Sequence, residues 1–506
     1  MKKISRLNVL FIASEADPII KVGGLGDVAG SLPRALNHLN ASLLSEENPF
    51  EIDVKLVIPF HGGIQRDLYP ARKVAEFYVS STKGKINAQA FLCEFEDMPV
   101  YLISGPPIPE EAPVYSSNSE LDGYKYTFFS LAALELAKNI GWKPDILHAN
   151  DWHTAPAVYS LAIHRPSDPF FKKTTSLLTV HNLPYLGTGS APALDAFGLP
   201  AAVDSQLPVW AQHLALPLGL LAADAIVAVS PGYAQEILTP EFGSGLHDFL
   251  QARSDSISGI LNGIDTQRWD PATDSEIAAN FSLANVTARP ANKIALQNEL
   301  GLKENPHSPL LAMVTRMDQQ KGVDIALEAL SQIFQSGTGA MHQIQVVFLG
   351  TGDPQLEEAT RQLEHLYPSQ MRAVITYNAN LSRRIYAGAD MLLMPSRYEP
   401  CGLSQMIAMR YGCVPVARAT GGLRDTIHDP AETPNSTGFL FNQARPAALV
   451  EAIQRALMVY SNDSNGWKEI QKRGMQQDFS WERSAHEYLQ RYLTLAHKKT
   501  RFPPKI

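Results

Sequence analysis

Residues 14–30 read SEADPIIKVGGLGDVAG. They connect an apolar run, Val9 to Ala13, which predicts a buried parallel strand, to a helical pattern, Val28 to Leu39. Such turns bind phosphates, because glycines let the backbone approach a ligand and a helix start presents free N–H groups. Lys21 adds a positive charge there. The stretch predicts an anion site in an α/β domain, although its glycines also fit a dinucleotide-binding oxidoreductase or a purely structural turn.

Composition and charge exclude several classes of protein. The chain has 506 residues, a formal net charge of −8 and three cysteines, Cys93, Cys401 and Cys413. Because so few cysteines cannot form a disulfide framework, we expect a reducing compartment. No basic run precedes the short tail at 498–501, so nucleic acid is not an expected partner. No membrane span or signal peptide is visible, and we expect a soluble, cytoplasmic protein without a membrane partner.

Apolar runs alternate with helical patterns in two successive series. Continuous apolar strands with helices between them indicate parallel sheets covered on both faces. In the first series the runs are 54–59, 100–104, 146–149, 176–180 and 225–229, with a hairpin strand at 88–93 and a loop at 117–121. In the second series they are 310–314, 345–349, 373–377, 391–394, 414–417 and 438–441.

The two series predict an α/β protein with two doubly wound, Rossmann-like domains. We assign residues 1–254 to the first domain and residues 255–480 to the second, because the glycines and polar side chains of 257–265 suit a crossing between domains. The last helical stripe, within 481–497, can pack on either half. We assign residues 481–506 to the first domain.

Polar residues follow several predicted strands, where ligands of parallel α/β sheets bind. In the first half these are Asp151, Trp152 and His153 after one strand, and His181 after the next. Any one of them could also serve only to hold a loop by hydrogen bonds. The histidine spacing does not match H-E-x-x-H and the chain has no C-x-x-C, so we expect no metal site.

In the second half, Arg316 ends one strand and Lys321 starts the next helix. Two cations at one turn suit a diphosphate leaving group, whose negative charge they would stabilise, although surface solvation is the alternative. Tyr377 ends a further strand, where it could face a nucleobase or cap the core. Glu399 stands before a helix expected to begin near Gly402, whose free amides could receive a phosphate.

Together, these motifs resemble those of the bacterial glycogen synthases and plant starch synthases, retaining glucosyltransferases of glycosyltransferase family 5 with two domains of the GT-B type. The matching segments run in the family's order: Lys21 to Val28, Asp151 to His153, Thr179 to Asn182, Leu261 to Asp265, Arg316 with Lys321, Glu399 to Gln405, Thr420 to Leu423, and Asp478 to Trp481. The resemblance covers nearly the whole chain. It implies two Rossmann-like domains that face each other across a deep cleft.

The resemblance also implies roles for individual residues. The residues that would bind the nucleotide sugar are Lys21, Gly23, Gly24, Asn262, Tyr377, Cys401, Gly402, Leu403, Ser404, Thr420, Gly421, Gly422 and Leu423. The catalytic set would be Asp151, His181, Arg316, Lys321 and Glu399, and the acceptor side would be formed by Glu15, Trp152 and His153. In this scheme Tyr377 stacks on adenine, Arg316 and Lys321 neutralise the leaving diphosphate, and His181 lies beside the glucose. Glu399 binds the glucose hydroxyls and stabilises positive charge at the anomeric carbon.

The reaction implied is transfer of glucose from ADP-glucose to the nonreducing end of an α-1,4-glucan, with retention of configuration and release of ADP. ADP-glucose and glycogen or a malto-oligosaccharide are then the partners, and no cofactor or metal is expected. A UDP-glucose-dependent enzyme and a catalytically silent glucan-binding protein remain alternatives. A dinucleotide-dependent oxidoreductase would need an acidic residue ending the second strand, which instead runs into Phe60 and His61. Same-face attack and double displacement both stay open.

Four positions depart from patterns common among related enzymes. Asn150 and Leu186 stand where many synthases have His and Gln, and both lie toward the acceptor side. Val22 replaces the Thr of many bacterial members, and Ile407 occupies the place of a second glutamate in related retaining transferases, as expected for the synthase branch.

Overall fold

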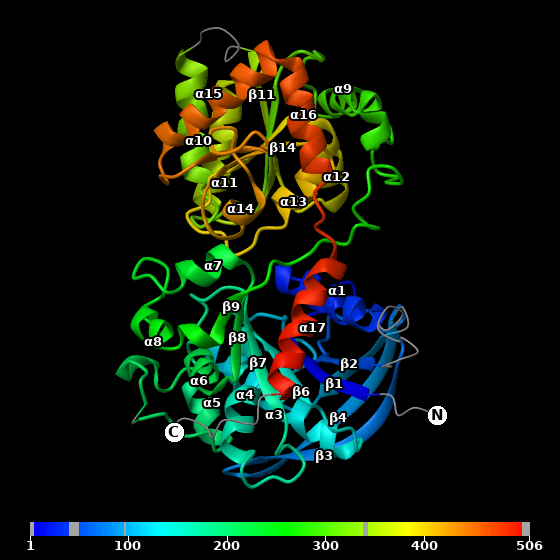
Figure 1. The fold of residues 1–506 in the computed structure, drawn as a ribbon, viewed down its shortest axis with the longest axis vertical. Coiled ribbons are helices and arrows are strands. Elements are labelled where there is room, and N and C mark those ends of the chain that lie inside the picture. The colour runs from blue at the N-terminus through cyan, green and yellow to red at the C-terminus, as the bar shows by residue number, and fades with distance from the viewer. Residues whose placement is uncertain (1–4, 40–49, 96–97, 204, 337–342, 498–506) are drawn as a thin grey trace. The chain divides into compact units, whose positions relative to one another are not determined.

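The computed structural model describes residues 5–39, 50–95, 98–203, 205–336 and 343–497, and it divides into two compact units (Figure 1). Unit 1 comprises Met1–Gly263 and Trp481–Ile506, and unit 2 comprises Ile264–Ser480. The basic run at 498–501 lies outside the described residues.

Unit 1 is built on a sheet that, in the described part of the chain, has the strand order β3-β4-β5-β2-β1-β6-β7-β8-β9. The strands are β1 (Ser5–Ile12), β2 (Phe50–Pro59), β3 (Ala71–Ser81), β4 (Gly84–Phe95), β5 (Met98–Ser104), β6 (Ile146–Asn150), β7 (Thr175–Val180), β8 (Ala225–Ala228) and β9 (Ile257–Gly259). Strands β3 and β4 form an antiparallel hairpin whose second strand pairs antiparallel with β5, and the other neighbours pair in parallel. The hairpin strand predicted at 88–93 is confirmed within β4.

The boundary between the units lies further along the chain than the sequence suggested. The predicted break between residues 254 and 255 falls before β9, which pairs in parallel with β8 in the sheet of unit 1. Because these backbone hydrogen bonds belong to the first sheet, the boundary follows Gly263.

The helices of unit 1 cover this sheet. They are α1 (Gly24–His38), α3 (Ser119–Asn139), α4 (Asp151–His164), α5 (Ala191–Ala196), α6 (Ala215–Ala222), α7 (Pro231–Glu236), α8 (His247–Ala252) and α17 (Trp481–His497), with short 3-10 turns η1 (Val209–Ala211) and η2 (Ser254–Ser256). The loop predicted at 117–121 is wrong in part, because α3 begins at Ser119. The Asn118 side chain accepts hydrogen bonds from the amides of Glu120 (3.1 Å) and Leu121 (3.2 Å) and so caps this helix.

Helix α17 returns from the end of the chain to unit 1, where it packs beside α1 (Figure 1). Its apolar face, including Tyr488 and Tyr492, joins the core of this unit. His148 of β6 is fully buried and bonds through Nδ1 to the Tyr492 hydroxyl (2.6 Å) and through Nε2 to Thr179 Oγ1 (2.8 Å). The helix is therefore held to the sheet by polar bonds as well as by apolar packing.

Unit 2 contains an all-parallel sheet with the order β12-β11-β10-β13-β14-β15 among its described residues. The strands are β10 (Leu310–Val314), β11 (Gln345–Gly350), β12 (Met371–Ile375), β13 (Met391–Met394), β14 (Val414–Arg418) and β15 (Phe439–Phe441). Numbered from β10, this is the order 3-2-1-4-5-6 of doubly wound Rossmann folds. The predicted fold class is confirmed.

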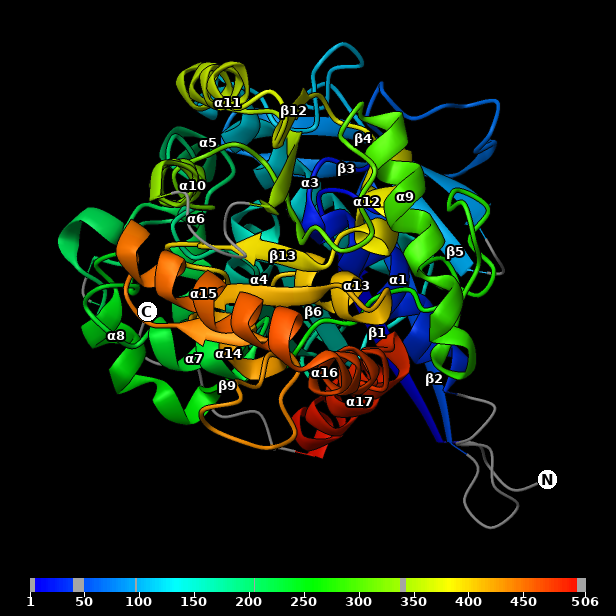
Figure 2. The ribbon, with the colours of Figure 1, turned by 90° about the horizontal axis from the view of Figure 1, so that it is seen from above.

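The helices of unit 2 pack on both this sheet and one another. They are η3 (Leu283–Ala288), α9 (Pro290–Glu299), α10 (Val323–Ser336), α11 (Pro354–Leu366), α12 (Ala379–Gly388), α13 (Ser404–Arg410), α14 (Gly421–Thr426), α15 (Pro446–Asn462) and α16 (Ser464–Met475). Figure 2 shows α15 lying over the sheet, where it contacts α10, β14 and β15.

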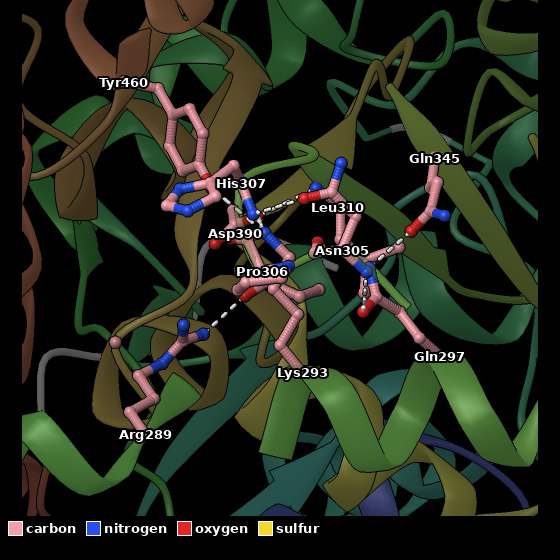
Figure 3. A network of polar contacts seen from close by, with 12 residues as sticks. Arg289, Lys293, Gln297, Asn305, Pro306, His307, Leu310, Gln345, Asp390 and Tyr460 are labelled. Atoms are coloured by element: carbon pink, nitrogen blue, oxygen red, sulfur yellow. Dashed lines mark hydrogen bonds and ion pairs between the residues drawn. The ribbon is translucent and has the colours of Figure 1, made fainter. Parts of the chain in front are cut away.

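A buried ion pair braces the amino-terminal edge of the unit 2 sheet (Figure 3). Lys293 of α9 lies 2.7 Å from Asp390, which directly precedes β13, and the two side chains are only 4% and 8% exposed. Lys293 also donates to the Tyr460 hydroxyl (3.0 Å), and Asp390 accepts the amide of Leu310 in β10 (2.8 Å). Because ligands of such sheets bind at the opposite, carboxyl edge, this network is structural.

Candidate active site

The strand order of unit 2 reverses between β10 and β13, and ligands of open α/β sheets bind beside such a reversal. Lys321 lies in the turn after β10, and Glu399 lies in the loop after β13. The Lys321 ammonium donates to Glu399 Oε1 at 2.8 Å and to Oε2 at 2.7 Å. Ser396 Oγ donates to Glu399 Oε2 at 3.0 Å. A buried ion pair, with Glu399 only 4% exposed, therefore occupies the expected ligand position of unit 2.

A small cavity of about 50 Å³ adjoins this ion pair. Its lining consists of Met313, Val314, Thr315, Lys321, Leu393, Met394, Ser396, Glu399, Gly402, Leu403 and Ser404. Three residues predicted to bind the nucleotide sugar, Gly402, Leu403 and Ser404, thus lie around the same space as Lys321 and Glu399. Gly402 has a φ of +74°, a left-handed conformation that glycine adopts without strain.

The glycine turn at 420–423 supports this loop from the neighbouring strand. The Gly422 amide donates to the Glu399 carbonyl oxygen at 3.1 Å. A Cβ atom at Gly422 would lie 2.0 Å from the Cys401 carbonyl oxygen, so only glycine fits there. Thr420 and Leu423 are buried. The turn therefore fixes the backbone between Glu399 and Cys401.

Two other residues of unit 2 that are predicted to bind the nucleotide sugar or to act in catalysis are exposed to solvent. Arg316 forms an ion pair with Asp318 at 3.0 Å, and the Arg316 side chain is 60% exposed. Tyr377 lies beyond the end of β12 and is 81% exposed, so it does not cap the core. Both side chains are accessible to a ligand from the solvent.

In unit 1, a carboxylate organises the glycine turn at residues 21–26. Glu15 is 1% exposed and accepts hydrogen bonds from the amides of Val22 and Gly23, the latter at 3.1 Å, and from the Tyr115 hydroxyl at 2.9 Å. Burial raises the pKa of Glu15 above its ordinary value, and these hydrogen bonds oppose that shift. The Gly23 amide, which the sequence predicts to face the donor, is thus occupied by Glu15 in this structure. Lys21 forms an ion pair of 2.6 Å with Asp27.

The strand order of unit 1 also reverses, between β1 and β6, and Asp151 follows β6 directly. Asp151 has a φ of +55° and accepts the amides of His181 (2.7 Å) and Asn182 (3.4 Å). Burial raises the pKa of Asp151 to about 7, and these amide bonds counteract the shift in part. The ring of His181, after β7, contacts Asn150 Oδ1 through Nε2 at 2.9 Å, and burial lowers its pKa to about 3. The turns after β6 and β7 therefore bring Asp151 and His181 together.

Trp152 and His153 belong to a group of packed aromatic rings. The His153 ring centre lies 4.3 Å from that of Trp152, 4.6 Å from Tyr126 and 4.9 Å from Tyr115. Because Tyr115 also bonds to Glu15, the three residues predicted for the acceptor side are connected through one ring. Asn262 is 6% exposed and lies after β9 in unit 1.

Three contacts of this site could not be found from the sequence. Tyr115 reaches Glu15 and Ser396 reaches Glu399 through tertiary structure, and no motif marks either residue. Asn150 was noticed only as a departure from the family pattern, whereas its contact with His181 depends on the pairing of β6 with β7.

No group of three or more His, Cys, Asp or Glu side chains among the described residues could hold a metal ion. Within the same ranges, none of the helices is long and apolar enough to span a bilayer.

Comparison with known families agrees with the two Rossmann-like sheets and their sites. The family described as "Starch synthase catalytic domain" matches residues 8–252, and "Glycosyl transferases group 1" matches residues 297–473. A sucrose-phosphate synthase from Thermosynechococcus elongatus shares the fold with a TM-score of 0.60 at 19% identity, covering 97% of this chain and 99% of that one. Fold and site thus define a glycosyltransferase of the GT-B type.

More similar proteins specify the family. The chain is 38% identical to a glycogen synthase of Geotalea daltonii over 98% of this chain and 100% of the relative, and 38% identical to one of Thermotoga maritima over 96% and 98%. The catalytic domain of starch synthase IV from Arabidopsis thaliana, bound to ADP and acarbose, superposes with a TM-score of 0.84 at 31% identity, covering 98% and 100%. The chain belongs to the glycogen synthase and starch synthase family, and it is a glucosyltransferase. The family, the fold and the enzyme class predicted from the sequence are confirmed.

Proposed function

We propose that this chain transfers glucose from ADP-glucose to the nonreducing end of an α-1,4-glucan, with retention of configuration and release of ADP. The observation that carries the proposal is the ion pair of the half-buried Lys321 and the buried Glu399 beside a cavity at the strand reversal of unit 2. A diphosphate leaving group needs a cation, and a positively charged anomeric carbon gains from a nearby carboxylate. The pair supplies both.

The remaining predicted residues fit this reaction. Arg316 is exposed and can add a second positive charge beside the leaving diphosphate. Tyr377 presents its ring to solvent, where it can stack on a nucleobase. The family resemblance further assigns Lys21 to the donor phosphates, His181 to the glucose, and Glu15, Asp151, Trp152 and His153 to the acceptor side.

Adenine is the proposed base for two reasons. The structure of starch synthase IV from Arabidopsis thaliana was solved with ADP bound. A purine also offers the exposed Tyr377 ring a larger stacking face than a pyrimidine does. UDP-glucose is therefore the weaker donor in this proposal.

The purified full chain tests the proposal with glycogen as acceptor. We expect ADP release and longer glucan chains with ADP-glucose, and a kcat/KM at least about 10-fold lower with UDP-glucose, which corresponds to about 1.4 kcal/mol. Chelation of divalent metals should leave the rate unchanged, since no cofactor or metal is proposed. Glycogen binding without ADP release would identify a silent glucan-binding protein, and reduction of NAD(P) would identify an oxidoreductase. A cytoplasmic location stays a prediction.

A further inference from the structure

One buried amide connects three strand ends of unit 1. Asn150 is the last residue of β6, is 0% exposed and lies opposite Thr179 of β7. Its Oδ1 lies 2.9 Å from His181 Nε2, and its Nδ2 donates to the carbonyl oxygen of Ile12, the last residue of β1, at 3.0 Å. Asn150 thus bridges β1 and the turn after β7 at the reversal of strand order.

The contact with Ile12 fixes which way the Asn150 amide points. A carbonyl oxygen can only accept a hydrogen bond, so the NH₂ group must face Ile12 and Oδ1 must face His181. The backbone of Asn150 is fixed as well. The Thr154 hydroxyl accepts a hydrogen bond from the backbone N–H of Asn150 (2.5 Å) and donates one to the backbone carbonyl oxygen of Asn150 (2.8 Å). Rotating the side-chain amide of Asn150 by 180° would place its Oδ1 against the carbonyl oxygen of Ile12, and neither oxygen could donate a hydrogen bond.

The orientation of the amide decides the protonation of His181. Because Oδ1 only accepts, Nε2 of His181 must carry a hydrogen. Burial keeps the ring neutral, since it lowers the pKa of His181 to about 3. In a neutral imidazole with its hydrogen on Nε2, Nδ1 is an unprotonated acceptor.

The titratable groups around His181 are compatible with a neutral ring. Asp151 accepts the backbone amide of His181, and burial raises the Asp151 pKa to about 7. His181 disfavours the charged forms of His148 and His153, and burial lowers the pKa of both.

We propose that Asn150 is a positioning residue that holds His181 in the Nε2–H tautomer, so that Nδ1 accepts a hydrogen bond from a hydroxyl group of the transferred sugar. The inference rests on the proposed function, which puts His181 beside that sugar. An acceptor of fixed orientation favours a sugar that offers a hydroxyl there over the corresponding deoxy sugar.

The wild-type protein gives the first test. Nitrogen chemical shifts of histidine-labelled full chain distinguish the two tautomers and the imidazolium, and the His181 signals are assigned as those missing from His181→Gln. We expect a neutral Nε2–H ring from pH 5.5 to 8. An Nδ1–H ring or an imidazolium in this range overturns the proposal, whatever the variants do.

Three variants give the second test. Asn150→Ala removes the acceptor and should mix the tautomers and lower kcat/KM for ADP-glucose about 10-fold. In Asn150→Asp, the protonated carboxyl group can donate to the Ile12 carbonyl oxygen while its other oxygen faces Nε2, and this form should restore the tautomer. Asn292→Ala is the control. Asn292 of unit 2 is also buried, and both its Oδ1 and its Nδ2 form hydrogen bonds, with the backbone of Ala279. It should lower thermal stability without moving the His181 signals.

The outcomes separate the two proposals. If Asn150→Ala folds but leaves both the His181 tautomer and kcat/KM unchanged, Asn150 has no positioning role. If the tautomer shifts as expected while no protein releases ADP, the positioning contact stands and the proposed function fails. If Asn150→Ala does not fold, the wild-type spectrum and Asn150→Asp still decide the tautomer.

Discussion

The buried carboxylates of the candidate site are held differently in the two units. In unit 2, Glu399 is paired with the ammonium of Lys321 and accepts a hydrogen bond from Ser396. In unit 1, Glu15 and Asp151 are equally inaccessible, but among the described residues both are held by backbone amides and neither forms an ion pair. Burial of a carboxylate favours its neutral form unless a nearby cation compensates. At the candidate site, unit 2 thus maintains a charge pair, whereas the pKa values of Glu15 and Asp151 in unit 1 are raised.

This difference assigns separate tasks to the units. A cation and a carboxylate at one place suit a reaction that separates charge, as departure of a diphosphate does. A carboxyl group with a pKa near neutrality suits binding of hydroxyl groups, because it can accept or donate a hydrogen bond.

Removal of the cation should have the largest effect. We expect Lys321→Ala to lower kcat/KM about 10³-fold through loss of leaving-group stabilisation. It should also lower the free energy of unfolding by about 3–5 kcal/mol, because Glu399 is left buried and unpaired. ADP release and thermal unfolding measure the two effects. Lys472→Ala removes an exposed ion pair with Glu469 and should change neither kcat/KM nor the free energy of unfolding. Equal losses of activity and stability in the two variants would contradict a special role for Lys321.

The second prediction concerns the pH dependence of stability at Asp151. Its pKa is about 7 in the folded protein against an ordinary value of 3.8, so the folded state favours the protonated carboxyl group. Unfolding free energy should therefore fall as pH rises from about 4 to about 7, by up to roughly 4 kcal/mol from this group. Asp151→Asn should abolish that loss, since asparagine tolerates the positive φ and keeps the acceptor for His181.

Thermal unfolding midpoints of both proteins between pH 4.5 and 8.5 provide the measurement. The difference between Asp151→Asn and wild type should grow with pH and level off above about 7. Histidines with lowered pKa values act in the opposite direction but cancel in this difference. Asp248→Asn, at a side chain that is 92% exposed, is the control and should give a flat difference.

A smaller effect is expected from the carboxylate that holds the glycine turn. Glu15→Ala removes both acceptor oxygens, and with them the hydrogen bonds from the amides of Val22 and Gly23. We expect the loss of about 1–3 kcal/mol of stability and a decrease in kcat/KM of about 10-fold or more. Hydrogen exchange of those amides should increase most. Unchanged protection there would show that another group holds the turn.

The smallest effect is expected at Tyr377, because its side chain is exposed and unit 2 does not need it for packing. Tyr377→Ala should raise KM for ADP-glucose about 5-fold with kcat nearly unchanged, through loss of base stacking. Stability should stay within about 0.5 kcal/mol. Tyr377→Phe keeps the ring and should resemble wild type. A fall in kcat alone would contradict a binding role.

Much of the fold could be predicted because parallel strands are buried on both faces and appear as continuous apolar runs. Strand β10 begins and ends where the pattern indicates, at Leu310 and Val314. Strand β3 was missed, since an edge strand with mostly exposed or half-buried positions lacks such a run. The segment of β9 reads in the sequence as a crossing between domains, because three residues that include a glycine are too few to show the apolar run of a strand.

The site was predictable only as a set of strand ends. Topology brings Lys321 to Glu399 across the reversal of strand order, and the sequence indicated both positions but not their pairing. Arg316 lies in the same turn as Lys321, but its exposure and its ion pair with Asp318 could not be predicted from the sequence. The contacts of Glu15 with Val22 and Gly23 could not be foreseen either, since they depend on the path of the backbone between them.

The return of α17 to unit 1 has a consequence for synthesis of the protein. Unit 2 is an insertion in the chain of unit 1, and the core around Val28 and Leu36 is completed by residues made after residue 480. On the ribosome, where domains fold as they emerge, unit 2 is complete before unit 1 can be. Until α17 has been synthesised, part of the apolar surface of unit 1 stays uncovered. We expect the nascent chain to depend most on chaperones during this interval.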